Sequence, residues 1–206
     1  MKVSLSVNLL KAALTVAPKK DNRSYLNGVC LDFVTDSEMV YCATDGSILY
    51  AGKTPIEYLD DPQKGGFQII VPYDAVSLAL KNHSKAYTAI FLESLPDGRY
   101  SLGDVIFGSL DGKFPDYERV IPQTVSGEAG QYNPENVAKA YKAISLACGL
   151  TEKIEFLQSG KNDCAIVKSR SSDHVCVVMP WRTHETIDYT GWHKPKAIVE
   201  TALVAA

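Results

Sequence analysis

Hydrophobic and polar positions alternate in short runs along the chain, and some of these runs are followed by stretches with helical spacing. The segment Lys2–Val7 alternates as a half-buried strand does. Asn8 then offers an N-cap for a helix that ends at Pro18. Its apolar side carries Leu10, Ala13, Leu14 and Ala17. Strands are expected next at Gly28–Thr35, Met39–Thr44 and Ser47–Pro55.

The same order of elements restarts after a polar stretch, Tyr58–Gly66, which reads as a loop. A strand is expected at Phe67–Val71, and a helix from Pro72 to about Ser84. The apolar side of this helix carries Val76, Ala79, Leu80 and His83. The strands predicted to follow it are Tyr87–Glu93, Arg99–Leu102 and Val105–Leu110.

A third copy of the pattern follows a linker at Pro122–Gly130. Asn133 as N-cap with Pro134 at the first helical position is a strong start signal, and Gly149 ends the helix. The predicted buried stripe is Val137, Tyr141, Ile144 and Cys148. Strands are expected at Lys153–Gln158, Asp163–Ser169 and Val175–Met179. The pattern therefore predicts an α+β protein of three strand–helix–three-strand units, and the stretch from Trp181 to Ala206 lies outside it.

Composition and charge narrow the function classes. The 206 residues carry a net charge of −3, so any contact with nucleic acid needs a local basic surface. The cysteines, five in number and without a C-x-x-C, are typical of free thiols in a reducing compartment. The start of the chain lacks the apolar segment of a signal peptide, and no run approaches membrane-spanning length. A cytoplasmic protein without membrane contact is expected.

Motifs of known enzymes are missing from the chain. No phosphate-binding loop, nucleophile elbow or zinc-protease motif occurs, and the four histidines lie far apart. Asp45 and Asp116 are the most conspicuous carboxylates, and both stand in turn sequences where Asx turns account for them. The sequence predicts a protein that is not an enzyme and needs no cofactor or metal. A spatial cluster of these two carboxylates with a histidine would favour an enzyme instead.

Three segments together resemble the beta subunit of bacterial DNA polymerase III, the replicative sliding clamp. Ala43–Gly46 follows a strand, Gly112–Pro122 carries the specific block Phe-Pro-Asp-Tyr-x-Arg-Val-x-Pro, and Val177–Arg182 ends the third unit. Tyr25–Gly28 also resembles the start of a sheet in that family. The resemblance implies the DNA-clamp fold, one full clamp domain followed by a half domain.

The same resemblance divides the chain. Residues 1–122 match the family's whole middle domain, residues 123–182 match the second half of its last domain, and residues 183–206 form an extra C-terminal tail. Where the family continues Thr-Asp-Gly with His-Arg-Leu, this chain has Ser47-Ile48-Leu49 and loses a basic side chain.

In the family, an apolar cleft between these two parts binds short peptides rich in Gln, Leu and Phe. Small, aliphatic and Met side chains around a groove suit such an anchor. The alternative is that Val120 and Val177–Met179 are strand core. The matching positions are Leu26, Thr44, Gly46, Leu49, Pro115, Arg119, Val120, Val177, Val178, Met179 and Pro180.

The helices of the family line a ring around DNA, and the helices predicted here carry lysines away from their apolar sides. Such ammonium groups would meet phosphates without reading bases. Exposed lysines also occur on any soluble helix, so this interpretation stands beside a purely structural one. The candidate DNA-binding residues are Lys11, Lys19, Lys20, Arg23, Lys81, Lys85, Lys139 and Lys142.

The resemblance therefore implies a clamp-like DNA replication accessory protein, a processivity factor. It docks DNA polymerase or other replication proteins and encircles double-stranded DNA as a homo-oligomer, independently of sequence. Three units per chain against about twelve in the family's ring would close with about four chains. The alternative is a binding module without a ring, which sequesters clamp-binding partners. A tail that plugs the cleft with Tyr189 or Trp192 is a further possibility.

Overall fold

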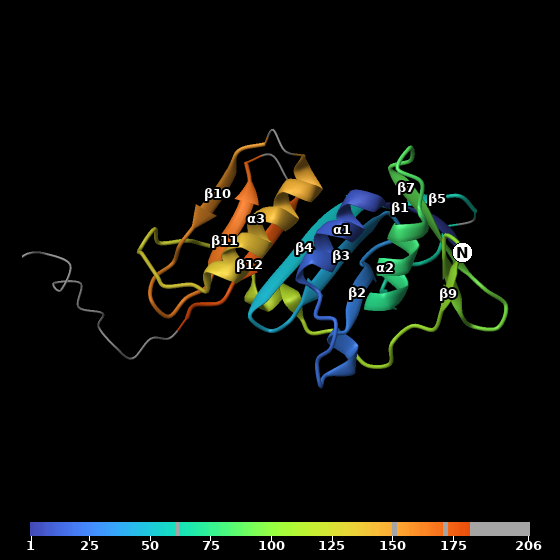
Figure 1. The fold of residues 1–206 in the computed structure, drawn as a ribbon, viewed down its shortest axis with the longest axis horizontal. Coiled ribbons are helices and arrows are strands. Elements are labelled where there is room, and N and C mark those ends of the chain that lie inside the picture. The colour runs from blue at the N-terminus through green and yellow to red at the C-terminus, as the bar shows by residue number, and fades with distance from the viewer. Residues whose placement is uncertain (61, 150–151, 171–172, 182–206) are drawn as a thin grey trace, which may run out of the picture.

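The computed structural model describes residues 1–60, 62–149, 152–170 and 173–181. Two antiparallel sheets and three α-helices make up this α+β fold (Figure 1). The expectations for residues 183–206, including Tyr189, Trp192 and a helix at 197–206, lie outside the described residues. No helix within the described ranges is long and apolar enough to cross a membrane.

The first two units interleave their strands. One sheet has the order β5-β1-β7-β8-β9, so the first strand of the chain pairs with strands of the second unit. Its elements are β1 (Lys2–Ser6), β5 (Glu57–Tyr58), β7 (Ala89–Ser94), β8 (Tyr100–Leu102) and β9 (Val105–Phe107). The short β5 lies at the start of the segment expected to be a loop and pairs with β1.

The larger sheet runs through all three units, in the order β10-β11-β12-β4-β3-β2-β6. The third unit joins the first through β12 and β4, with Val178 opposite Ile48 and His174 opposite Gly52. Its elements are β2 (Gly28–Phe33), β3 (Glu38–Thr44), β4 (Ile48–Pro55), β6 (Phe67–Pro72), β10 (Ile154–Leu157), β11 (Ala165–Ser169) and β12 (His174–Val178).

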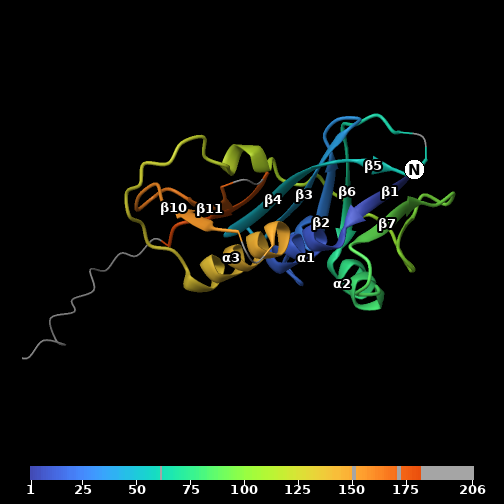
Figure 2. The ribbon, with the colours of Figure 1, turned by 90° about the horizontal axis from the view of Figure 1, so that it is seen from above.

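Three helices lie in a row on one side of the sheets (Figure 2). They are α1 (Val7–Val16), α2 (Tyr73–Asn82) and α3 (Pro134–Cys148), and α3 packs beside α1. Before α3 the chain forms an isolated bridge between Tyr132 and Pro180 rather than a strand. Two short 3-10 turns, η1 (Ser24–Leu26) and η2 (Tyr117–Val120), complete the elements.

The larger sheet is buried on both of its faces, and this explains its nearly continuous hydrophobic strands. On β3, Met39 and Tyr41 point into the main core under the helices, whereas Val40 and Cys42 belong to a second core on the opposite face. Phe114 and Tyr117 cover this second core from outside. Cys30, Cys42 and Cys176 are buried free thiols in the sheet, and burial raises the pKa of each.

Two details of the helices differ from the sequence prediction. Ser6 caps α1 instead of Asn8, since its hydroxyl accepts a hydrogen bond from the Leu9 amide at 3.4 Å. The buried side of α3 includes Ala140, Ala143 and Ile144, while Tyr141 is exposed. Small side chains at a helix contact allow closer packing than a stripe of large residues would. The predicted caps at Asn133 and Gly149 are confirmed.

Candidate functional site

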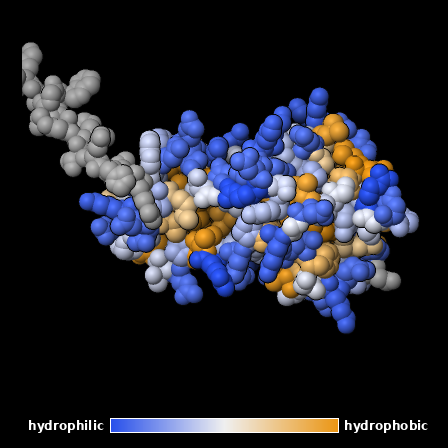
Figure 3. Space-filling view, turned by 90° about the horizontal axis from the view of Figure 1, so that it is seen from below, coloured by the Kyte–Doolittle hydropathy of each residue, from blue (hydrophilic) through white to orange (hydrophobic). Residues whose placement is uncertain are grey.

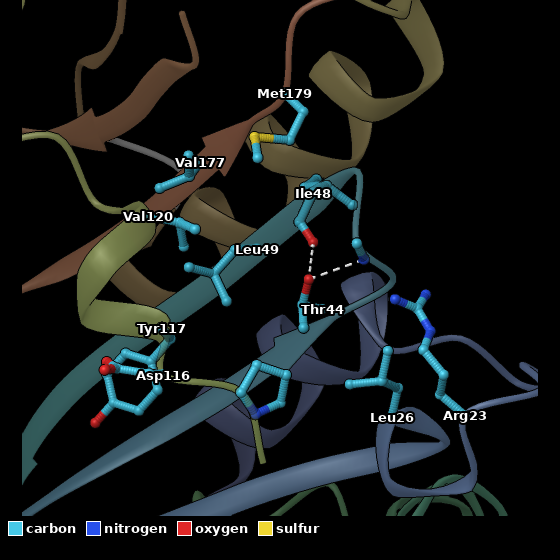
Figure 4. A pocket seen from close by; sticks show the side chains of 12 residues that line it. Arg23, Leu26, Thr44, Ile48, Leu49, Asp116, Tyr117, Val120, Val177 and Met179 are labelled. Atoms are coloured by element: carbon cyan, nitrogen blue, oxygen red, sulfur yellow. Dashed lines mark hydrogen bonds between the residues drawn. The ribbon is translucent and has the colours of Figure 1, made fainter.

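A pocket of about 180 Å³ opens where the third unit meets the first, on the face of the larger sheet opposite the helices (Figure 4). In Figure 2, the yellow-green turn η2 marks this face. The walls come from η1, the β3–β4 turn, η2 and the end of β12. The pocket is lined by Arg23, Leu26, Thr44, Gly46, Ile48, Leu49, Pro115, Asp116, Tyr117, Val120, Val177 and Met179.

The β3–β4 turn is fixed by its own side chains. The Thr44 hydroxyl donates to the Ile48 carbonyl at 2.7 Å and accepts from the Gly46 amide at 3.0 Å. Asp45 Oδ1 accepts from the amides of Ser47 and Ile48. The Asx turn predicted for Asp45 is therefore confirmed. Gly46 has φ 93°, a conformation that favours glycine.

A guanidinium lies at one edge of the pocket. Arg23 donates to the Asp45 carbonyl at 2.9 Å and forms an ion pair with Asp21 at 3.0 Å. The hydrogen bonds from Arg23 lower the pKa of the Asp21 carboxyl from 3.8 to about 2. A Cβ at Gly46 would lie 3.2 Å from Arg23 Nη2, so the glycine also leaves room for this side chain. Arg23, expected among the DNA-binding residues, thus lies at the pocket.

The η2 segment holds another wall in place through two buried aromatic rings. Phe114 and Tyr117 pack into the second core, which leaves Val120 partly exposed toward the pocket. The Asx turn predicted for Asp116 is wrong: its side chain does not cap η2, but pairs with Arg119 Nε at 2.9 Å. Arg119 is mostly exposed and does not line the pocket.

Strand β12 ends at the pocket. Because successive side chains of a strand point to opposite faces of the sheet, only some of its residues line the pocket. Val177 belongs to the second core and lines the pocket. Val178 points to the opposite face, into the main core under the helices, and does not line it. Met179 is 39% exposed at the rim, and its amide donates to the Ser47 carbonyl at 2.9 Å. Pro180 lies beyond the lining and bridges to Tyr132.

The structure therefore brings together most of the positions that the resemblance indicated, namely Leu26, Thr44, Gly46, Leu49, Pro115, Val120, Val177 and Met179. It does not bring Arg119, Val178 or Pro180 to the lining. It adds Arg23, Ile48, Asp116 and Tyr117. Asp116 and Tyr117 stand in the Phe-Pro-Asp-Tyr block, so that motif was the signal that pointed to them.

The chemistry of the pocket suits binding. Its lining combines aliphatic, Met and aromatic groups with one guanidinium and one carboxylate at the edges, a composition that holds an apolar side chain. No histidine or cysteine from the described part of the chain lines it, and Asp45 lies outside the lining. Among the described residues, no group of three His, Cys, Asp or Glu side chains is arranged to hold a metal ion.

The candidate DNA-binding lysines lie on or next to the helices. Lys11, Lys81 and Lys142 are exposed on α1, α2 and α3, and Lys139 is half-buried on α3. Lys19 and Lys20 are exposed after α1, and Lys85 is exposed after α2. The helices that carry Lys11, Lys81, Lys139 and Lys142 lie on the face of the larger sheet opposite η2 (Figure 2), whereas Lys19 and Lys20 lie in the loop that leads to Arg23 at the pocket.

Solved structures of bacterial sliding clamps share this fold. The DNA polymerase III subunit beta of Pseudomonas aeruginosa is 22% identical, with a TM-score of 0.67. The corresponding subunits of Thermotoga maritima and Streptococcus pyogenes are 16% and 13% identical, with TM-scores of 0.67 and 0.69. Each alignment covers 89% of this chain and 66% of the clamp chain. The chain has the bacterial sliding-clamp fold.

These relationships are visible in the fold rather than in sequence similarity across the chain. No protein-family model matches the sequence, and no curated protein matches it. The chain spans just under two thirds of the length of these clamps.

Proposed function

We propose that this protein is a clamp-like DNA replication accessory protein that docks DNA polymerase or other replication proteins through the pocket at the β4–β12 junction, and that it is not an enzyme. The carrying observation is that three distant segments, at residues 23–49, 115–120 and 177–179, form one apolar pocket on a sliding-clamp fold. Peptide docking needs such a concave apolar site with a few polar groups at its edge.

A peptide titration tests this proposal. Met179→Asp places a charge at the rim, where Met179 is 39% exposed, without entering the core. We expect saturable binding of a fluorescent peptide with a Gln-, Leu- and Phe-containing anchor, weakened about tenfold or more by this substitution, which is about 1.4 kcal/mol. Leu59→Asp, at an exposed position just after β5 in the other sheet, is the matched control. Equal binding by both variants would contradict the proposal.

The helix side supports a second function, contact with double-stranded DNA. Exposed lysines come from all three helices, and these helices lie on one side of the sheets (Figure 2). Ammonium groups spread over a surface bind phosphates without sequence preference. This function fits a homo-oligomer that surrounds the duplex in the cytoplasm.

Self-association has physical support at the ends of the sheets. Strands β9 and β10 are terminal strands, whose outer edges can pair with another chain. Large hydrophobic side chains are exposed around α2, β7 and β9, at Leu78, Tyr87, Phe91 and Ile106. Figure 3 shows hydrophobic patches toward this end of the molecule, within a mostly hydrophilic surface.

Solution mass measured with and without a DNA duplex tests this second function. We expect a mass of several chains at micromolar concentration, and binding to DNA that weakens steeply with salt. A protein that stays monomeric and binds peptide but not DNA would instead favour the alternative, a clamp-like module that sequesters clamp-binding partners.

We also propose that the chain divides into a full clamp domain at residues 1–122 and a half domain at residues 123–182, and that peptide docking uses both. The half domain contributes one wall of the pocket, through Val177 and Met179. Residues 122–130 form neither helix nor strand, as a connecting segment would. The position of the pocket between the two parts gives a reason for keeping them together.

A further inference from the structure

A second hollow borders the same side chain, Tyr117, as the docking pocket. It has a volume of about 500 Å³ and lies between the outer face of β2 and β6 and the segment that leads into η2. Its lining is more polar than that of the docking pocket and includes Asp32, Gln68, Lys113, Tyr117 and Glu118. Tyr117 lines both hollows, so the two share this side chain as a common wall.

The shared wall is held rigidly. The ring of Tyr117 is buried in the second core, and its hydroxyl donates to Asp32 Oδ2 at 3.0 Å. Gln68 Nε2 donates to the same oxygen, also at 3.0 Å. Burial and the nearby Asp32 raise the pKa of Tyr117, which keeps its hydroxyl protonated as a donor. The Asp32 carboxylate is thus oriented before any ligand arrives.

The charge of the second hollow differs from that of the docking pocket. Its lining includes two carboxylates, Asp32 and Glu118, and one ammonium group, Lys113, and so carries net negative charge. Across the docking pocket, the cationic Arg23 lies on the side opposite Tyr117 (Figure 4). The apolar pocket is therefore flanked by the Arg23–Asp21 ion pair on one side and by a hollow of net negative charge on the other.

We propose that the docking groove continues past Tyr117 into this second hollow, and that a docked partner peptide places a Lys or Arg side chain there, next to its hydrophobic anchor. The inference rests on the proposed docking function. A negatively charged lining favours a basic side chain by charge complementarity. Because Tyr117 borders both hollows, a peptide anchored in the first can extend into the second. The hollow would thus add specificity among partners that carry similar apolar anchors.

Two fluorescent peptides test the inference. They have the same Leu- and Phe-containing anchor, flanked by Lys residues in one and by Gln residues in the other. The full chain is titrated as wild type, as the double variant Asp32→Asn with Glu118→Gln, and as Glu57→Gln. Glu57 is an exposed carboxylate on β5 in the other sheet, so its variant controls for loss of charge.

We expect the Lys-flanked peptide to bind the wild type about fivefold more tightly than the Gln-flanked one at low salt, with the advantage shrinking as salt rises. The double variant should lose this advantage and the Glu57→Gln protein should keep it. Asn at position 32 still offers an oxygen to the Tyr117 hydroxyl, and a urea midpoint close to that of the wild type shows that the variant is folded.

Different failures have different meanings. If both peptides bind but the Lys advantage is equal in the wild type and the double variant, the second hollow is not the basic subsite and this inference is overturned. If a small cation in the buffer abolishes the advantage at constant ionic strength, the hollow binds free ions instead, which also overturns it. If neither peptide binds the wild type, the docking function itself fails together with the inference.

Discussion

At the scale of single residues, the edge of the pocket depends on Arg23 and the groups that hold it. Asp21 pairs with its guanidinium, and the Asp45 carbonyl accepts a second hydrogen bond. These two contacts hold the long Arg23 side chain in one conformation, which it would not keep if it were free in solvent. A fixed cation at the edge of an apolar pocket is suited to orient a bound peptide.

Asp21 makes this part of the molecule sensitive to acid. Its pKa falls to about 2 in the folded chain from 3.8, so its contribution to stability is present above pH 3.8 and is lost as the pH falls through about 2. We expect Asp21→Asn to lower the urea midpoint at pH 7, and the difference from wild type to disappear near pH 2. A constant difference for Asp21→Asn at every pH would contradict the assignment.

Gly46 is the second residue on which this edge depends. Its φ of 93° and the closeness of Arg23 both disfavour a side chain. We expect Gly46→Ala to reduce the free energy of unfolding by about 1–3 kcal/mol, measured by urea unfolding, and to weaken peptide binding. Gly127→Ala is the matched control, because Gly127 also has positive φ, 78°, but nothing lies within 4 Å of its added Cβ. Equal losses would show that the closeness of Arg23 does not matter.

The sequence predicted much of the pocket because one continuous block, Gly112–Pro122, and two short segments carry it. It did not separate Val177 from Val178, since both are hydrophobic and the strand is buried on its two faces. It also did not assign Arg23 to the pocket, because the hydrogen bond between Arg23 and Asp45 joins segments that only the fold brings together. Tertiary interactions of this kind leave no local pattern.

At the scale of elements, α3 holds the third unit against the first. It packs beside α1, and its buried side includes Ala140 and Ala143. The strands of the same unit extend the larger sheet through β12. The sequence predicted Tyr141 on the buried side of α3, because helical spacing favours a large hydrophobic residue over the neighbouring alanines. The fold buries the alanines instead, and small side chains let α3 approach the elements packed against it closely.

The N-cap of α3 is a direct test of how much this helix matters. Asn133 accepts a hydrogen bond from the Glu135 amide at 2.9 Å. We expect Asn133→Ala to cost about 1 kcal/mol in the free energy of unfolding, whereas Asn133→Asp keeps the cap and the stability. Urea unfolding of the full chain measures both. An alanine variant as stable as the aspartate variant would contradict the role of the cap.

At the scale of the whole molecule, two candidate surfaces face opposite ways. The helices with their lysines lie on one side of the larger sheet, and the pocket with η2 lies on the other (Figure 2). A protein with this arrangement can hold a partner without covering the surface proposed for DNA. Binding of peptide and of DNA should therefore be independent.

Charge reversal on α3 tests this separation. We expect the double variant Lys139→Glu with Lys142→Glu to weaken duplex binding and to reduce the slope of log affinity against log salt, by about 0.9 for each DNA phosphate that is no longer neutralised. Its affinity for the anchor peptide should stay unchanged. Lys64→Glu with Lys161→Glu is the control, because both residues are exposed and neither stands on a helix. A larger decrease of DNA binding in the control would place the DNA surface elsewhere.

The central claim is that a partner peptide docks in the pocket between the third unit and the first. Chemical-shift mapping of the ¹⁵N-labelled full chain during titration with the anchor peptide tests it most directly. We expect the largest shifts at Leu26, Thr44, Leu49, Val177 and Met179, with little change along α1, α2 and α3. Shifts confined to the helices, or none at saturating peptide, would contradict the claim.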